Sequence, residues 1–249
     1  MCIRDRSGSV GSFLHVLDVA EANFLQKHAE NSRLGIPLII GIDAIHGNAM
    51  VRGTTVYPAP LAMASSWNTE LVEQASIETA SEMRATGSHW TFAPNIDLAR
   101  DARWGRVGET FGEDTYLVGE MGVAMVRGLQ QGDFSSRNAV VANAKHWVAG
   151  GEPLTGINLS PMDVSIRTLY EDFFPPFKKA IDAGVFTFMA AHNEINGEPA
   201  HGSHFLLTEV LRDNWKFEGF VVSDWMDVSR LHTFHKVAKT PEDAVFQTV

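Results

Sequence analysis

Short apolar runs alternate with longer amphipathic segments along most of the chain. This alternation constrains the fold more than any other feature, because strands separated by helical crossovers pair in parallel. We expect six strands, at residues 12–16, 37–42, 90–95, 140–145, 185–191 and 219–223. The sequence therefore predicts an α/β protein with a parallel sheet.

Helices are expected between these strands, at residues 21–32, 69–86, 115–129, 165–183 and 203–214, with another beginning at 241. The segment 69–86 is the clearest, because Asn68 or Thr69 can cap its start and Gly87 follows its end. The Pro175-Pro176 pair is expected to interrupt the segment 165–183 and to start a helix afresh, since proline has no backbone N–H to donate and is tolerated in a first helical turn.

Length and motifs narrow the architecture. The 249 residues fall in the usual size range of one α/β barrel. Neither a G-x-G-x-x-G fingerprint nor a phosphate-binding P-loop follows any strand, which disfavours a doubly wound nucleotide-binding fold. We expect an incomplete (β/α)8 TIM-type barrel with about six strands present.

Charge and composition exclude several classes of partner. The net charge is −10, from 30 acidic and 20 basic residues, and no Lys/Arg run occurs, so a nucleic-acid partner is not expected. The single cysteine excludes an internal disulfide. No stretch of 18 apolar residues occurs, so we expect no membrane span.

The two ends suggest that the chain is part of a longer polypeptide. Residues 1–9 are charged and lack the apolar core of a signal peptide, so we interpret them as a non-native leader. The segment 241–249 begins as a helix and stops without a cap. The organised region is therefore expected to be 10–249.

Polar side chains follow five of the expected strands. They are Asp43 after the second, the loop 97–114 after the third, Lys145 and His146 at the fourth, His192 after the fifth and Asp224 after the sixth. The carboxyl ends of parallel strands converge on one mouth. Carboxylates, cations and the nearby indole of Trp225 are the groups that bind sugar hydroxyls and ring faces.

Each of these residues also has an ordinary structural interpretation. Asp224 could cap the next helix, and Asp43 could be a turn residue. Arg106 could pair with acidic residues of its own loop, and His146 could be a buried core histidine. The chemical interpretation is preferred because the structural ones require five separate coincidences at equivalent strand ends.

Five motifs resemble, in order, those of glycoside hydrolase family 3. They are GIDAIHG at 41–47, RDARWGRVGETFGED at 100–114, KHW at 145–147, HNEING at 192–197 and GFVVSDW at 219–225. The resemblance covers roughly residues 10–249. It implies a (β/α)8-type first domain that needs no cofactor or metal.

The resemblance also implies roles for single residues. Asp224, the aspartate of the S-D-W motif, corresponds to the nucleophile of a retaining mechanism. Asp43, Arg106, Lys145 and His146 correspond to the family's sugar-binding residues. His192 stands where many members carry a tyrosine beside the nucleophile.

The acid/base group is not expected within this chain. In the family it comes from outside the barrel, usually from a following α/β domain, and the local carboxyls Glu152, Glu194 and Asp227 carry no motif for that role. We therefore expect this chain alone to be inactive. An alternative is a sugar-binding barrel fragment that cannot turn its ligand over.

The expected substrate is a terminal β-D-glucosyl or related β-glycosyl residue of an oligosaccharide or glycoside. The loop after Lys145 reads KHWVAGG and lacks the His-Asp pair of the N-acetylglucosamine-cleaving subgroup. The resemblance suggests a periplasmic or secreted bacterial enzyme.

Two rival enzyme classes use similar scaffolds. A Schiff-base aldolase could use Lys145, but would require a desolvated lysine without a carboxylate nucleophile beside it. A metal-dependent barrel hydrolase is disfavoured because no H-x-H motif follows the first strand and His201 and His204 form an isolated pair.

Overall fold

A computed structural model describes residues 10–132 and 134–248, and the expected leader at 1–9 lies outside this range. Six parallel strands form two groups of three. The first group is β1 (Ser12–Leu14), β2 (Ile39–Ile42) and β3 (Trp90–Thr91), and the second is β4 (Asn143–Trp147), β5 (Thr187–Ala190) and β8 (Phe220–Val222). The prediction of an α/β fold with parallel strands is confirmed.

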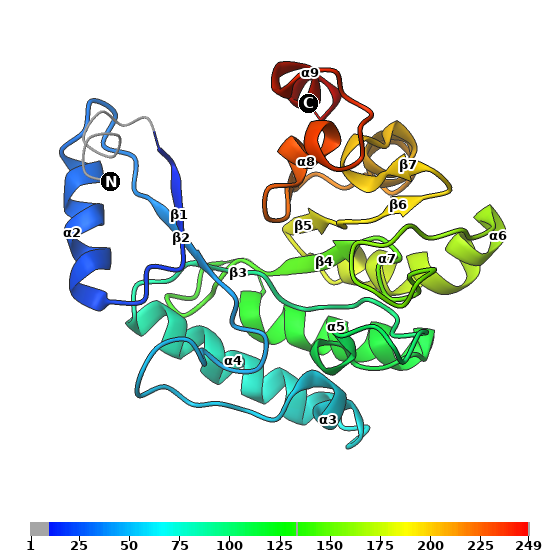
Figure 1. Cartoon of the computed structure of the whole chain (residues 1–249). Coiled ribbons are helices and arrows are strands. Elements are labelled where there is room, and N and C mark those ends of the chain that lie inside the picture. The colour runs from blue at the N-terminus through cyan, green and yellow to red at the C-terminus, as the bar shows by residue number, and fades with distance from the viewer. Residues whose placement is uncertain (1–9, 133, 249) are drawn as a thin grey trace.

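The two groups continue into each other. Parallel bridges join Trp90 to Val141 and Asn95 to Lys145, so the array runs from β1 through β3 and β4 to β8. Within the described part of the chain, β1 and β8 do not pair, and the array stays open (Figure 1). The carboxyl ends of all six strands face the same side because the strands are parallel.

Helices connect successive strands and cover the outer face of the array (Figure 1). They are α2 (Val19–Glu30), α4 (Thr69–Ala85), α5 (Thr115–Gln130), α7 (Phe174–Asp182) and the π-helical η4 (Phe205–Asn214). The main core lies between these helices and the strands and includes Met83, Met121, Phe177 and Phe188. A smaller cluster of Trp90, Phe92 and Met189 covers the inner face.

The helix expected at 69–86 forms as its sequence signals indicate. Asn68 caps it, its Oδ1 accepting the Leu71 N–H at 3.0 Å. The chain leaves the helix through Gly87, whose φ of +90° is a conformation that residues with a side chain rarely adopt. The N-cap and the terminating glycine therefore determine both ends of this helix.

Several boundary predictions are wrong. The third strand ends at Thr91 instead of 95. The fourth strand begins at Asn143 instead of 140 and continues to Trp147. The new helix expected at the prolines is present, because α7 begins at Phe174. The preceding part of the segment is also helical: α6 (Ile166–Thr168) leads into α7 through a π-helical turn, η2 (Leu169–Phe173). Pro175 and Pro176 lie in the first turn of α7, where the missing N–H groups cost little.

Several short elements were not expected. They are α3 (Pro60–Ala64), η1 (Val107–Glu109), β6 (Glu194–Ile195), β7 (Glu198–Pro199), η3 (Ala200–Gly202) and α8 (Asp227–Thr233). Such segments are too short to show a period in the sequence. The β6–β7 hairpin had a signal, because Asn196-Gly197 supplies two positive-φ residues (+53° and +86°) for its turn.

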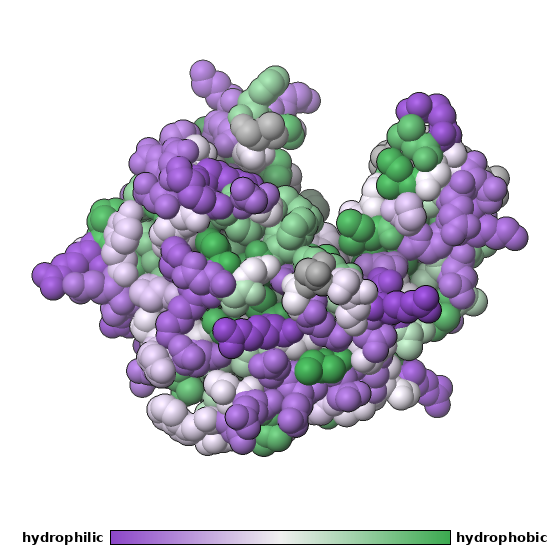
Figure 2. All heavy atoms as spheres, turned by 180° about the vertical axis from the view of Figure 1, so that it is seen from behind, coloured by the Kyte–Doolittle hydropathy of each residue, from purple (hydrophilic) through white to green (hydrophobic). Residues whose placement is uncertain are grey.

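The last helix, α9 (Pro241–Thr248), agrees with the expectation for the end of the chain. Together with α8 it forms a lobe on one side of the array, while α2 and β1 form the lobe opposite (Figure 1). Viewed from behind, the surface is hollowed between these lobes (Figure 2). Among the described residues, no helix is both long and apolar enough to cross a membrane.

Candidate active site

A cavity of about 630 Å³ opens at the carboxyl ends of the strands. All seven residues expected in the site line it: Asp43, Arg106, Lys145, His146, His192, Asp224 and Trp225. Trp90, Phe92 and Met189 of the inner apolar cluster also line it. The fold therefore collects side chains from five strand ends around one hollow.

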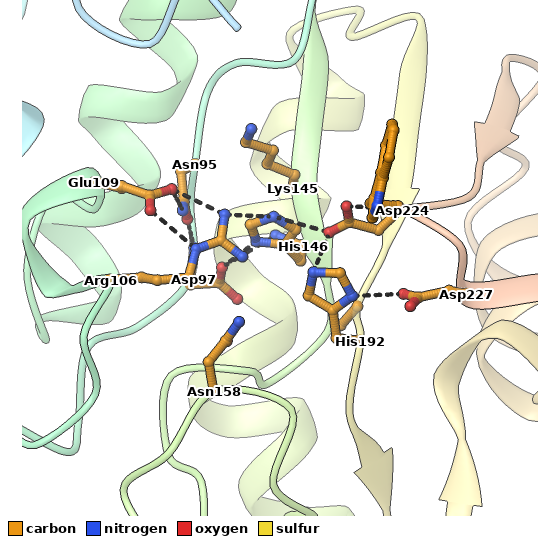
Figure 3. Close-up of polar contacts among 12 residues, drawn as sticks. Asn95, Asp97, Arg106, Glu109, Lys145, His146, Asn158, His192, Asp224 and Asp227 are labelled. Atoms are coloured by element: carbon orange, nitrogen blue, oxygen red, sulfur yellow. Dashed lines mark hydrogen bonds and ion pairs between the residues drawn. The ribbon is translucent and has the colours of Figure 1, made fainter. Parts of the chain in front are cut away.

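Asp224 lies two residues after β8 and is held from several directions (Figure 3). Its Oδ2 is 2.9 Å from Nε2 of His192 and 3.5 Å from Nε2 of His146, and its Oδ1 accepts the Trp225 N–H at 2.6 Å. Burial alone would raise the pKa of Asp224, but the hydrogen bond from His192, the charge of that imidazolium and the Trp225 N–H hold it well below its ordinary value.

His192 forms a bridge between two carboxylates. Its Nε2 contacts Asp224, and its Nδ1 lies 2.7 Å from Oδ2 of Asp227 (Figure 3). Burial lowers the pKa of His192, but hydrogen bonds to the two carboxylates outweigh burial and raise it to about 9. An imidazolium therefore faces Asp224.

His146 belongs to a separate buried chain of polar contacts. Its Nδ1 lies 2.7 Å from Oδ2 of Asp97, and its Nε2 lies 3.0 Å from Nη2 of Arg106, which also binds Glu109 through two N–H groups. Burial lowers the pKa of His146, with Asp97 opposing it. The ring is therefore neutral, donating to Asp97 and accepting from Arg106.

Lys145 and Asp43 form an ion pair at the cavity wall. The Lys145 side chain is only 4% exposed, and its Nζ lies 2.6 Å from Oδ1 of Asp43, whose Oδ2 contacts Nε2 of His15 at 3.0 Å. Burial tends to raise the pKa of Asp43, but the Lys145 ammonium lowers it below its ordinary value. This pairing disfavours a Schiff-base role, which requires an uncharged amine.

Trp225 supplies an apolar surface next to the carboxylate. It is 66% exposed and lines the cavity, so an indole face remains available for stacking. The Trp225 backbone N–H donates to the Asp224 carboxylate, so the indole and the carboxylate belong to the same turn. An aromatic face beside a carboxylate suits a ligand that carries both hydroxyls and C–H groups.

The structure tests the ordinary structural interpretations of Asp224, Arg106 and His146. The capping interpretation of Asp224 is wrong, because the N-cap of α8 is Met226 and no side chain caps that helix. Arg106 does pair with Glu109 of its own loop, but also reaches His146. His146 is buried as a core histidine would be, yet it still lines the cavity.

Other polar residues of the site were not identified from the sequence as site residues. Asp97 and Glu109 orient His146 and Arg106, His15 contacts Asp43, and Asp227 contacts His192. The position of Asp97, just after the third strand, was the one available signal. Glu109 was expected only as one of several acidic residues in the loop with which Arg106 could pair, and that pairing is present.

His192, Asp224 and Asp227 are the one group of potential metal ligands found in the described part of the chain. Their donor atoms lie within 4.8 Å of one another. However, the two carboxylates contact opposite nitrogens of the imidazole, so a single ion cannot replace both hydrogen bonds. We interpret the group as a hydrogen-bonded chain.

Three carboxyls were considered as local acid/base groups, and each is engaged elsewhere. Glu152 pairs with Arg100, Glu194 lies 2.7 Å from His235, and Asp227 is only 1% exposed. Among the described residues, the carboxylates that line the cavity are Asp43 and Asp224. Asp43 is bound to Lys145, so none of the described residues presents a second free carboxyl to Asp224.

The raised pKa of His192 predicts a loss of stability at alkaline pH. The value of about 9 lies above the ordinary 6.5, so the folded state holds a proton that the unfolded chain releases. The free energy of unfolding therefore contains the full contribution of the His192 ion pairs below about pH 6.5. This contribution is lost as the pH rises from there to about 9. Melting temperatures measured across this range should fall more steeply for the wild type than for His192→Gln. Parallel curves would contradict the expectation.

Comparisons with known proteins agree on one family. Residues 11–249 match the model of the Glycosyl hydrolase family 3 N terminal domain. A β-xylosidase of Formosa agariphila is 44% identical over 92% of this chain and 33% of its own length. A periplasmic β-glucosidase of Salmonella typhimurium is 38% identical over 96% of this chain and 31% of its own.

Solved structures give the same result. A β-glucosidase from Listeria innocua in complex with glucose matches with a TM-score of 0.91 and 36% identity, over 97% of this chain and 33% of that one. A β-glucosidase involved in saponin metabolism from intestinal bacteria is 41% identical, also with a TM-score of 0.91. The chain thus spans about a third of the length of the relatives that it matches.

Proposed function

The chain belongs to glycosyl hydrolase family 3, and from this premise we propose that it carries the nucleophile of a retaining β-glycosidase. The proposed substrate is a terminal β-D-glucosyl or related β-glycosyl residue of an oligosaccharide or glycoside. The observation that supports it most is Asp224, an ionised carboxylate at the cavity wall whose pKa is lowered by His192 beside it.

The open parallel array supports a corresponding proposal for the domain. Residues 10–249 form six strands of a (β/α)8 barrel, and a further part of the polypeptide supplies the acid/base carboxyl. The similarity to whole β-glucosidases supports this, because the chain spans about a third of their length with a TM-score of 0.91. One relative is a periplasmic β-glucosidase, which favours a periplasmic or secreted location.

In the proposed first step, a carboxylate oxygen of Asp224 attacks the anomeric carbon. A glycosyl ester forms, the bond to the aglycone oxygen breaks, and that oxygen takes a proton from the acid/base carboxyl. In the second step, water gives its proton to that same carboxyl and attacks the anomeric carbon, which releases Asp224. The low pKa of Asp224 keeps it unprotonated for the attack.

The remaining cavity residues bind the sugar. Asp43 can accept hydroxyl protons, and Lys145 and Arg106 can donate to hydroxyl oxygens. Trp225 can stack on the apolar face of a sugar ring. Related sugars in this proposal include β-xylosyl residues, since two of the relatives are β-xylosidases.

Alanine at a sugar-binding position should reduce catalysis strongly. For Arg106→Ala we expect kcat/KM on an aryl β-glucoside to fall about 10²-fold or more, roughly 2.7 kcal/mol, if the contact strengthens in the transition state. Asp43→Ala, Lys145→Ala and His146→Ala should lose a similar factor. Steady-state kinetics of the polypeptide encoded by the complete reading frame would measure this.

Arg103→Ala is the matched control, because Arg103 lies in the same loop but pairs with Asp101 and has a 66% exposed side chain. It should retain wild-type kinetics. If kcat/KM falls only slightly, and by the same factor, in Arg106→Ala and Arg103→Ala, Arg106 has a purely structural role in its loop.

A further inference from the structure

Asp227 is a buried carboxylate that the proposed reaction does not use. It is the first residue of α8 and is 1% exposed, so its charge requires partners. Its Oδ1 lies 2.7 Å from Nη1 of Arg230, and its Oδ2 lies 2.7 Å from Nδ1 of His192. Asp227 is not among the residues that line the cavity, so it cannot reach a leaving group.

The contacts of the two ring nitrogens indicate the protonation of His192. Both face carboxylate oxygens, at 2.9 Å on the Asp224 side and 2.7 Å on the Asp227 side. Nδ1 also lies 3.1 Å from Nη1 of Arg230, but its contact with Asp227 is shorter. An ionised carboxylate can only accept, so each nitrogen donates to the carboxylate that it faces. The ring is therefore an imidazolium between Asp224 and Asp227.

A second histidine links Asp227 to the backbone of Asp224. Nε2 of His201 accepts the Asp224 N–H at 3.1 Å, while its Nδ1 lies 3.0 Å from the Ala191 carbonyl and 3.5 Å from Oδ2 of Asp227. His201 thus acts as a neutral ring, and burial lowers its pKa. The side chain and the backbone of Asp224 are both held by histidines that Asp227 contacts.

We propose that Asp227 is a positioning residue for Asp224, acting through His192. Its carboxylate keeps the imidazolium in place, so that Nε2 donates to Oδ2 of Asp224 and keeps the nucleophile ionised and oriented. The inference rests on the proposed function, in which Asp224 attacks the sugar. The Asp227 N–H donates to the Asp224 carbonyl at 3.3 Å, so both carboxylates belong to one turn. This turn fixes the distance between the two carboxylates, and the His192 ring lies between them.

The charged and titratable groups around His192 determine the sign of the pH effect. They are Asp224, Asp227, Arg230, His201 and His146, whose ring stacks at 6.1 Å between centroids. Without the charge of Asp227, burial and the Arg230 guanidinium oppose the imidazolium, so the pKa of His192 falls. Asp224 then loses its cationic partner, and its own pKa rises.

The test is Asp227→Asn in the polypeptide encoded by the complete reading frame. We expect kcat/KM on an aryl β-glucoside to fall about 10- to 100-fold at neutral pH, the loss of one charge-assisted hydrogen bond. The acidic limb of the profile of kcat/KM against pH should move to higher pH. The ¹⁵N signals of the His192 ring should titrate at lower pH than in the wild type. Asp243→Asn, in the first turn of α9, should change none of these.

Other outcomes separate this inference from the proposed function. A uniform loss across pH, with an unchanged His192 titration, would reduce Asp227 to a structural residue. If Asp227→Asn does not fold, His192→Gln should show the same shift of the acidic limb, and an unshifted limb would overturn the proposal. Full activity of Asp224→Ala would instead refute the proposed function itself.

Discussion

Replacement of Asp224 by alanine should abolish turnover of an aryl β-glucoside by the polypeptide encoded by the complete reading frame. Asp224 lies at the cavity wall, where the imidazolium of His192 stabilises its ionised form. Removing a nucleophile that acts with its neighbours as a unit costs roughly 10⁴-fold or more in kcat. Initial rates of purified wild type and variant would measure the loss.

Azide distinguishes a lost nucleophile from a damaged fold. The anion can occupy the space left by the carboxylate and attack the anomeric carbon, giving a glycosyl azide of inverted configuration. Asp182→Ala is the control, since Asp182 is an exposed aspartate on α7 with a 63% exposed side chain, and its rate should be unchanged. Wild-type-like turnover by Asp224→Ala would place the nucleophile elsewhere.

The second large effect concerns the 249-residue chain by itself, which should not turn over cellobiose. Glu152, Glu194 and Asp227 are each engaged elsewhere, so the described residues present no free carboxyl to protonate a leaving group at Asp224. Loss of general acid catalysis removes about 10²- to 10⁴-fold in rate, and more when the leaving group is poor. The chain would then act as a sugar-binding barrel fragment.

An activated aryl glycoside should reveal the half-reaction that this chain retains. Its leaving group needs little protonation, so a slow burst of phenolate should accompany a glycosyl adduct on Asp224, detected by peptide mass spectrometry. Without a base the ester should persist. Steady hydrolysis of cellobiose, in a preparation free of host glucosidase, would show that an acid/base group lies within the chain.

The sequence predicted the α/β class and the set of polar residues at the strand ends. Strand and helix periods are local, and a glycine or an N-cap acts within a few residues, so the ends of α4 could be predicted closely. The helix expected to start afresh at Pro175-Pro176 is α7, which begins at Phe174. The π-helical turn η2 that joins it to α6 was not expected, and the buried Phe173 and Phe174 lie at this junction.

The seven expected site residues line one cavity because parallel strands place their carboxyl ends on one side. This follows from topology, and topology can be inferred from the alternation of elements along the chain. Their roles stay predictions. Their partners could not be inferred, since Asp97 lies 49 residues from His146 and Asp43 lies 102 residues from Lys145.

Asp227 shows what only the tertiary structure decides. In the sequence it is an acidic residue three positions after Asp224, suited to the first turn of a helix. In the folded protein it is 1% exposed and bound to His192, which comes from the end of β5. Burial and ion pairing set protonation states, and both depend on atoms that only folding brings together. The sequence therefore shows which residue types are present at the site, while the fold determines their charges and their partners.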